Sequence, residues 1–154
     1  MDLTFNFAEN SKNLANLEVE QNYSVCDIGD FEDITQYTME NKEINLQIPA
    51  KIFLNKALNL TGAEISFGSL PAEIDYVSNH KHKENEEIYI ILSGKGSIKI
   101  EEREINLQKG SIVKVKTGVA RAMKSSKNEA ITYLCIQVKE DSLENYTLTD
   151  AEML

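Results

Sequence analysis

The stretch HKHKENEEIYIILSGKG, residues 80–96, is the part of the sequence that decides the fold. Residues 88–92 are apolar or aromatic at every position, and the charged Glu87 opens this run. A strand with two apolar faces is expected where one face lines a barrel and the other face is covered. Gly94 and Gly96 predict a turn at the end of the strand.

Several other strands are predicted on both sides of this stretch. They are alternating or wholly apolar, and they span residues 63–67, 98–100, 105–107, 113–115 and 130–138. The polar link at residues 101–103 joins two of them into a β-hairpin. Short strands about ten residues apart, with no long amphipathic helix between them, predict an all-β antiparallel barrel or jelly roll.

The N-terminal part of the chain has a different texture. Residues 1–22 are polar and rich in asparagine, and Leu14 and Leu17 have helical spacing, which predicts either a short helix or a loosely held arm. Residues 31–39 predict one or two helical turns, and the alternation at residues 44–48 predicts a strand.

The expected domain boundary follows from this change in composition and residue pattern. Residues 51–59 fit either a short strand or a helical turn, because their apolar spacing favours neither. A length of 154 residues suits one domain that buries roughly 68–70% of its unfolded surface. We therefore expect an N-terminal arm at residues 1–23 and a barrel domain at residues 24–154, with a motif core at residues 62–138.

Composition excludes several classes of function. The formal net charge of −9 disfavours binding to nucleic acid, although a local positive pocket can still bind a small anion. No apolar run has the roughly 18 residues of a membrane span, and the N-terminus lacks the pattern of a secretory signal, so we expect a cytoplasmic protein. Cys26 and Cys135 are too few for a disulfide framework and are expected to be reduced.

The two histidines predict a metal site. His80 and His82 lie two residues apart, so both side chains project to the same face of an extended chain. A turn at residues 83–86 can bring Glu87 to the same side. Two imidazoles and one carboxylate form a facial triad, which suits iron and also accepts zinc, manganese, nickel or copper. A divalent metal is therefore the cofactor that these residues predict.

The alternative is that the histidines occupy an exposed polar loop and that Glu87 is one of several acidic charges there. Three features favour a site: the chain has just these two histidines, the glutamate opens an apolar strand, and glycines follow at a fixed distance. A carboxylate that faces a barrel interior without a partner costs on the order of several kcal/mol, so it needs a metal or an arginine.

These residues resemble the first motif of the cupin superfamily, which is HxH, three or four residues, Glu, six residues and Gly. His80, His82, Glu87 and Gly94 fit this spacing, whereas the glycine that usually precedes the motif is missing. Longer stretches are similar, in the same order, to small single-domain bacterial cupins of the conserved-barrel (cupin 2) type, whose activity is unassigned; they span residues 60–71, 80–96 and 134–150. The resemblance covers residues 24–154.

The resemblance implies the double-stranded β-helix, or jelly-roll barrel, with a metal at the three residues of the first motif. The second motif falls on residues 110–125, where Gly110 and Gly118 match but Arg121 replaces the histidine that would be the fourth ligand. An arginine cannot give up its proton, so it is not a ligand. At about 5 Å from a divalent ion, with an effective dielectric of 20, its repulsion would be roughly 6–7 kcal/mol before screening by Glu87.

Two arrangements satisfy these charges. In the first, the three residues hold a metal, and Arg121 binds an anionic group of the substrate with a bidentate fork. In the second, Arg121 pairs with Glu87 and the cavity holds no metal. Tyr89 has the same parity as Glu87 on the predicted strand, so we expect it to border the cavity, where it positions a substrate, donates a proton or only packs in the core.

The two arrangements predict different functions. The first predicts a metal-dependent enzyme, an oxygenase or isomerase of the cupin type, that acts on a small anionic or sugar-like substrate with Arg121 and Tyr89 as its catalytic candidates. The second predicts a non-catalytic barrel that binds or senses a metabolite. A third hypothesis is a metal-free sugar isomerase or epimerase that uses His80 with Tyr89. The strand that is apolar on both faces also suits burial by a partner, and cupins of this type are commonly dimers, so we expect a homodimer.

Overall fold

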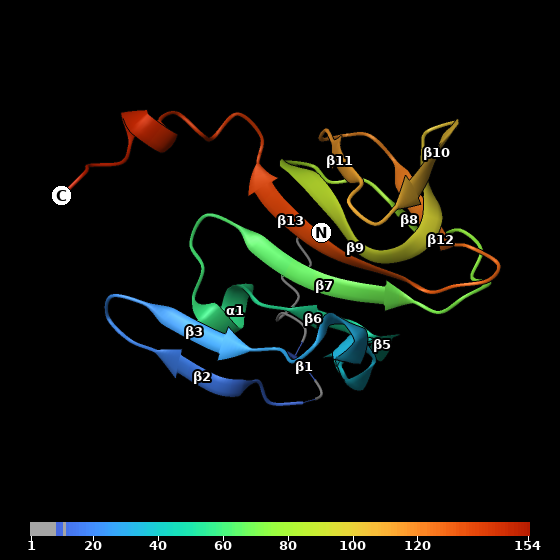
Figure 1. Ribbon diagram of the computed structural model, residues 1–154, viewed down its shortest axis with the longest axis horizontal. Helices are drawn as coiled ribbons and strands as arrows, with labels where there is room; N and C mark the ends of the chain where they lie inside the picture. Colours follow the sequence, from blue (N-terminus) through green and yellow to red (C-terminus); the bar gives the residue numbers. More distant parts are fainter. Residues whose placement is uncertain (1–8, 11) are drawn as a thin grey trace.

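A strongly curved antiparallel sheet dominates the computed structural model, which describes residues 9–10 and 12–154 (Figure 1). The strands are β1 Glu9–Asn10, β2 Ala15–Val19, β3 Ser24–Asp27, β4 Thr38–Asn41, β5 Leu46–Pro49, β6 Lys51–Phe53, β7 Glu64–Leu70, β8 Val77–His80, β9 Asn85–Ile100, β10 Arg103–Gln108, β11 Ile112–Val115, β12 Arg121–Ser125 and β13 Ile131–Lys139. The helices are short: η1 Phe31–Gln36, α1 Asn55–Leu58 and η2 Thr147–Thr149. The predicted all-β class is confirmed.

The large sheet is organised around β9. Its strand order is β6-β7-β13-β9-β12-β8, and β10 and β11 also pair with β9. The first part of β9 pairs with β11 and β13, and its second part pairs with β10 and β12. This exchange of partners curls the sheet into a half-barrel, with a smaller layer of N-terminal strands along β6 and β7 (Figure 1).

Two glycines allow β9 to bend where it changes partners. Gly94 has a φ of +79°, and a Cβ at this position would lie 1.7 Å from the carbonyl oxygen of Ala130. A Cβ on Gly96 would lie 2.1 Å from the carbonyl oxygen of Lys124. The expected turn at these glycines is therefore wrong, because the chain continues as one strand. The glycines instead permit the close approach of the neighbouring backbones.

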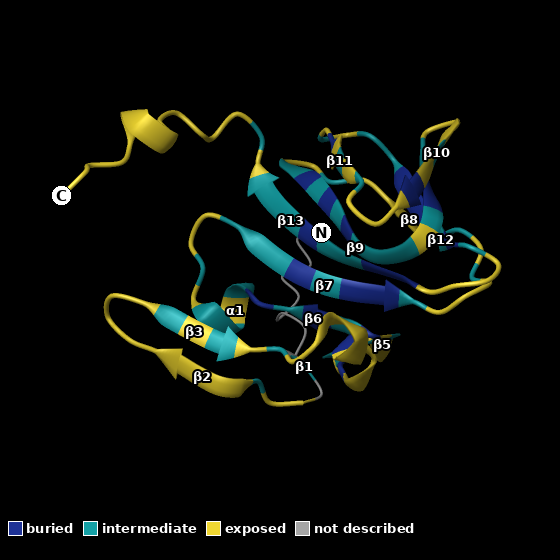
Figure 2. Cartoon of the chain, in the orientation of Figure 1, coloured by how far each residue is buried: buried dark blue, intermediate teal, exposed yellow. Residues whose placement is uncertain are grey.

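The core consists of two hydrophobic clusters (Figure 2). The inner cluster fills the curve of the large sheet and contains Tyr89, Ile91, Ile98, Leu107, Val115, Met123, Ile131 and Cys135. The second cluster contains Ile34, Tyr37, Ile52 and Leu54 and packs against Ile65 and Phe67 of β7. The N-terminal layer therefore covers the outer face of the sheet at β6 and β7.

The outer face of the sheet is also apolar beyond this cover. Leu134, Ile90 and Ile112 form one row across β13, β9 and β11, and Ile136 and Ile88 lie side by side in the next row. Ile112 is 68% exposed, and the other four are partly exposed. These five residues, which we call the outer strip, belong to neither core cluster.

The N-terminal segment was expected to form either a short helix or a loosely held arm, and the helix is not present in its described residues. A helix around Leu14 and Leu17 is not formed, because Ala15–Val19 is a strand that pairs with β3. Leu14 packs against the second cluster, whereas Leu17 is 44% exposed. Residues 1–8 and 11 of the expected arm lie outside the described residues.

Other local expectations are resolved as follows. The helical turns predicted at residues 31–39 are the 3-10 helix η1, after which the chain enters β4. Residues 51–59 contain both of the expected forms, since β6 is followed by the single-turn helix α1. The predicted hairpin is β9 and β10, with Ile98 opposite Ile105. Within the described part of the chain, no helix is long and apolar enough to span a membrane.

Three glycine-to-alanine substitutions should separate the cost in stability of a Cβ clash with a neighbouring backbone from the cost of a positive φ angle. Gly94→Ala should lower the free energy of unfolding by more than about 3 kcal/mol, because both a backbone clash and a positive φ oppose it. Gly110→Ala, at a φ of +88° with open space, should cost about 1–2 kcal/mol. Gly62→Ala, with no neighbour within 4 Å, is the control and should stay within about 0.5 kcal/mol. Urea denaturation measures all three, and equal effects at residues 94 and 110 would contradict the bend.

Candidate functional site

A cavity of about 380 Å³ lies against the inner face of the large sheet. Its lining comes from β9, β13, β12 and β7 of the sheet, from β8, and from the segment that contains β5 and β6. His80, His82, Glu87, Tyr89 and Arg121 all line it. The structure therefore brings together all five residues that the sequence singled out.

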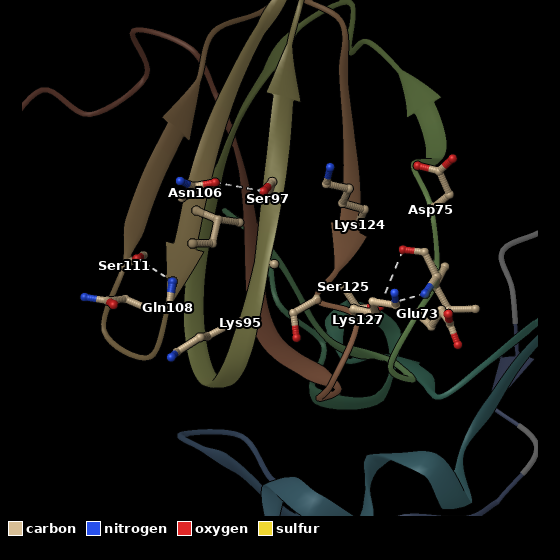
Figure 3. A pocket seen from close by; sticks show the side chains of 14 residues that line it. Glu73, Asp75, Lys95, Ser97, Asn106, Gln108, Ser111, Lys124, Ser125 and Lys127 are labelled. Carbon is tan, nitrogen blue, oxygen red and sulfur yellow. Dashed lines mark hydrogen bonds between the residues drawn. The ribbon is translucent and has the colours of Figure 1, made fainter.

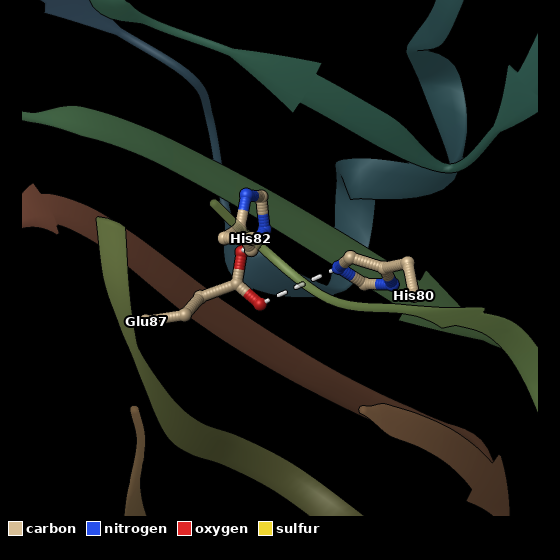
Figure 4. Close-up of side chains that lie close together, drawn as sticks. All are labelled: His80, His82 and Glu87. Atoms are coloured by element: carbon tan, nitrogen blue, oxygen red, sulfur yellow. Dashed lines mark hydrogen bonds and ion pairs between the residues drawn. The ribbon is translucent and has the colours of Figure 1, made fainter. Parts of the chain in front are cut away.

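The three candidate metal ligands converge (Figure 4). His80 ends β8, His82 lies in the following loop, and Glu87 lies in β9. One ligand atom of each residue lies within 4.8 Å of the others. His82 Nε2 is 2.9 Å from Glu87 Oε2, and His80 Nε2 is 3.6 Å from Glu87 Oε1. This group of two imidazoles and one carboxylate could hold a divalent ion.

Backbone contacts hold the imidazole of His80 and the loop that carries His82 in place. His80 Nδ1 donates a hydrogen bond to the carbonyl oxygen of Ser78, a residue with a φ of +57°. This bond places one ring proton on Nδ1, so Nε2 faces Glu87. Nε2 donates to the carboxylate when the imidazole is protonated and would offer its lone pair to a metal when the imidazole is neutral. The carbonyl oxygen of His82 accepts a hydrogen bond of 2.8 Å from Gly118 N, which ties the histidine loop to the turn after β11.

Glu87 is an ionised carboxylate in a buried position, with an exposed fraction of 3%. Burial alone would raise its pKa, but hydrogen bonds from His80 and Tyr89 and electrostatic interactions with His82 and Arg121 outweigh burial and lower the pKa to about 2. Interaction with Glu87 raises the pKa of His80, whereas burial lowers the pKa of His82. His82 is thus favoured in the neutral form that binds metals.

Tyr89 borders the cavity, as its parity predicts, and is also part of the inner core cluster. Its hydroxyl donates a hydrogen bond to Glu87 Oε1. Burial and the nearby carboxylate raise the pKa of the phenol, so the group keeps its proton at neutral pH. Tyr89 therefore holds one oxygen of Glu87 in a fixed orientation.

Arg121 is a buried cation with incomplete partners. Its side chain is 1% exposed, and it lies next to His80 in the pairing of β12 with β8. Its Nε is 3.9 Å from Glu87 Oε1, and its Nη2 donates to the carbonyl oxygen of Lys116 at 3.4 Å. Nε and Nη1 have no hydrogen-bond partner among the described residues. Buried polar groups are rarely left without partners, so these two donors point to a missing acceptor.

Sequence reasoning missed the cavity residues that come from strands far from the histidine motif. Tyr133, Cys135 and Gln137 line the cavity from β13, and Lys51 lines it from β6. Met123 of β12 also lines it. Alternation along the final strand could have identified the three residues of β13 as one face, but not which face meets Glu87.

A larger hollow, of about 880 Å³, lies away from these residues (Figure 3). Its buried hydroxyls are already satisfied: Ser125 Oγ donates to the carbonyl oxygen of Pro71 at 2.6 Å, and Ser97 Oγ donates to Asn106 Oδ1 at 3.2 Å. Its charged side chains are of both signs. No unsatisfied buried group of the described residues faces this hollow, which favours the smaller cavity as the functional site.

The pKa of Glu87 predicts how stability depends on pH. Because its folded pKa is about 2 against an ordinary value of 4.5, its ionised form contributes on the order of 3 kcal/mol above pH 4.5, and this is lost as the pH falls toward 2. The difference in the free energy of unfolding between wild type and Glu87→Gln should therefore shrink as the pH is lowered from 5 to 2. Denaturation across this range measures it, with the exposed Glu84→Gln as the charge control. A constant difference would contradict the role given to the buried carboxylate.

Comparison with known proteins gives the family. A family model described as a cupin domain matches residues 71–137. The crystal structure of a cupin protein from Bacteroides fragilis is 45% identical, with a TM-score of 0.65, over 68% of this chain and 88% of that chain. No match is found among curated proteins.

A more distant solved structure shows likeness of fold alone. A predicted oxalate decarboxylase from Thermotoga maritima is 20% identical, with a TM-score of 0.53, over 62% of this chain and 83% of that chain. A DMSP lyase from Ruegeria pomeroyi is 22% identical, with a TM-score of 0.46, over 59% of this chain and 46% of that chain. With the motif, the half-barrel and the extent of the Bacteroides match, the chain belongs to the cupin family.

Proposed function

We propose that this cupin holds a divalent metal at His80, His82 and Glu87 and acts as an enzyme on a small anionic or sugar-like molecule. The observation that carries the proposal is the buried guanidinium of Arg121 beside the three converging ligands, with Nε and Nη1 lacking an acceptor. A bound anion would supply an acceptor to these donors in charge-assisted hydrogen bonds. The same anion would reduce the repulsion between the guanidinium and the metal.

The chain's own residues divide the work at this site. A metal with open coordination positions would supply Lewis-acid chemistry, as oxygenases and isomerases of this kind require. Arg121 would hold the anionic group of the substrate, and its burial keeps water from competing for that contact. Tyr89 would donate to Glu87 Oε1 and so hold the carboxylate in a fixed orientation.

A second candidate function is a metal-free barrel that binds or senses a metabolite. It is favoured by the contacts of Glu87, whose charge is already compensated by His82 at 2.9 Å and by Arg121 at 3.9 Å. The metal-free isomerase ranks below both. It needs His80 and Tyr89 on the substrate together, whereas the Tyr89 hydroxyl is directed to Glu87.

The metal proposal predicts a stoichiometric ion in protein purified without a metal-binding tag. Elemental analysis should find about one iron, zinc, manganese, nickel or copper per chain, and His82→Ala should lose it because one of three ligands is removed. Arg121→His should raise metal affinity by more than tenfold in competition with a chelator, because it replaces a repulsive cation by a ligand. Lys81→Ala, at the exposed position between the histidines, is the control.

Two outcomes would count against this proposal. Protein that takes up no metal after supplementation would exclude the metal-dependent enzyme and leave the metal-free binding barrel. Metal that persists equally in His82→Ala would place the ion elsewhere in the chain. Thermal melting of each variant shows whether a loss of metal is separate from a loss of fold.

We also propose that the expected homodimer forms through the outer strip. The five residues are apolar, lie on strands of the large sheet and are left out of both core clusters. A sheet face of this composition is normally covered in a stable protein. A second copy of the chain offers the same face, as a two-fold interface requires.

The dimer proposal predicts a molar mass of twice 17.4 kDa by light scattering after size exclusion. Ile90→Lys should shift the mass to that of one chain, because it places a charge in the middle of the strip. Val25→Lys introduces the same charge at an exposed apolar position of β3 and should leave the dimer intact. A wild type with the mass of one chain would refute this interface.

A further inference from the structure

The cavity lining contains a second cationic side chain, Lys51 of β6. We propose that the ligand of this cavity is a small molecule with two anionic groups, one bound by Arg121 and the other by Lys51. This inference rests on the proposed function, because it takes Arg121 as the first anion anchor. It adds a specificity-determining residue and narrows the substrate class from any small anion to a dianion such as a dicarboxylate.

The strand register places Lys51 at the edge of the cavity floor. Lys51 of β6 lies opposite Gly68 of β7, which in turn lies opposite Tyr133 of β13. The next row of the same parity contains Phe53, Ser66, Cys135 and Tyr89. Residues of one parity share one face of a sheet, and both rows belong to the face that lines the cavity.

The absence of a side chain at Gly68 lets the Tyr133 ring lie over this position, within reach of Lys51. A Cβ at Gly68 would lie 2.5 Å from the hydroxyl oxygen of Tyr133, so any side chain would displace that ring. Lys51 Nζ lies 4.8 Å from the centroid of the Tyr133 ring and 5.2 Å from that of Phe53. These two cation–π contacts hold the ammonium against the aromatic wall of the cavity.

Lys51 is not neutralised by the protein. No carboxylate oxygen of the described residues lies within 4.0 Å of Lys51 Nζ. Glu64, the carboxylate whose charge it influences, accepts a hydrogen bond from Asn55 N at 2.9 Å. Glu87 is directed to His80, His82 and Arg121.

The lining therefore carries an excess of positive charge. Its fully ionised side chains are Lys51, Arg121 and Glu87, which is two cations against one carboxylate before any metal is added. A ligand with one anionic group can contact one of the two cations directly, whereas a ligand with two anionic groups can contact both. Apolar and aromatic residues also line the cavity, including Tyr133, Leu70 and Met123. They favour a ligand whose two charges are joined by a short hydrocarbon spacer.

The test compares acids that differ by one charge at equal chain length. Calorimetry would measure the binding of succinate, glutarate and adipate, and of butyrate, pentanoate and hexanoate, to the purified full chain. At least one dicarboxylate should bind about tenfold tighter than its monocarboxylate partner. Lys51→Met, which keeps the aliphatic stem, should reduce that ratio to less than about twofold, because the second anion anchor is removed. Lys56→Met, an exposed lysine outside the cavity, should keep the ratio of the wild type.

Each outcome decides the inference. Equal affinity for the paired acids, a Lys51→Met variant that weakens both acids alike, or a wild type that binds none of the six acids would overturn it. Elemental analysis of the same samples tests the proposed metal independently of the dianion inference. Discrimination by charge in a protein that takes up no metal would retain the dianion site and reject the metal. Metal uptake without discrimination would do the opposite.

Discussion

The carboxylate of Glu87 is the constraint on which the rest of the site depends. A charge with an exposed fraction of 3% is strongly unfavourable inside a barrel unless other groups compensate for it. Tyr89 donates to one of its oxygens, His82 lies against the other, and Arg121 adds a positive charge at 3.9 Å. Tyr89 lies in the same strand as Glu87, His82 lies in the preceding loop, and Arg121 lies in β12. The fold must bring these three residues together for the carboxylate to stay ionised.

The bend of β9 is what makes that convergence possible. Arg121 is paired with Ile100 at one end of β9, and Glu87 lies near the other end. Over the 13 residues from 87 to 100 a straight strand would extend ~43 Å, yet Arg121 Nε lies 3.9 Å from Glu87 Oε1. Gly94 and Gly96 permit the change of direction, because the carbonyl groups of Ala130 and Lys124 occupy the space that a Cβ would need. The ion pair between Arg121 and Glu87 therefore depends on the bend that Gly94 and Gly96 permit.

Local patterns allowed much of this to be predicted. The parity of His80 and His82, and the shared parity of Glu87 and Tyr89, depend on neighbouring residues alone, and all four lie together as expected. Sequence patterns could not distinguish a bend from a turn at Gly94, because a positive φ suits both.

What sequence patterns left out depends on long-range pairing. Lys51 reaches the cavity through strand pairings with residues 68 and 133, and a local pattern does not specify such partners. The N-terminal strand β2 was missed because the spacing of Leu14 and Leu17 is helical, whereas pairing with β3 determines the observed form. In the proposed function, the exchange of a histidine for Arg121 makes metal and anion binding interdependent. Lys51 and Arg121 already make the cavity lining positive, and a divalent ion would increase that positive charge, whereas a dianionic ligand would decrease it. The metal should therefore strengthen the binding of the ligand, and the ligand should strengthen the binding of the metal by the same factor.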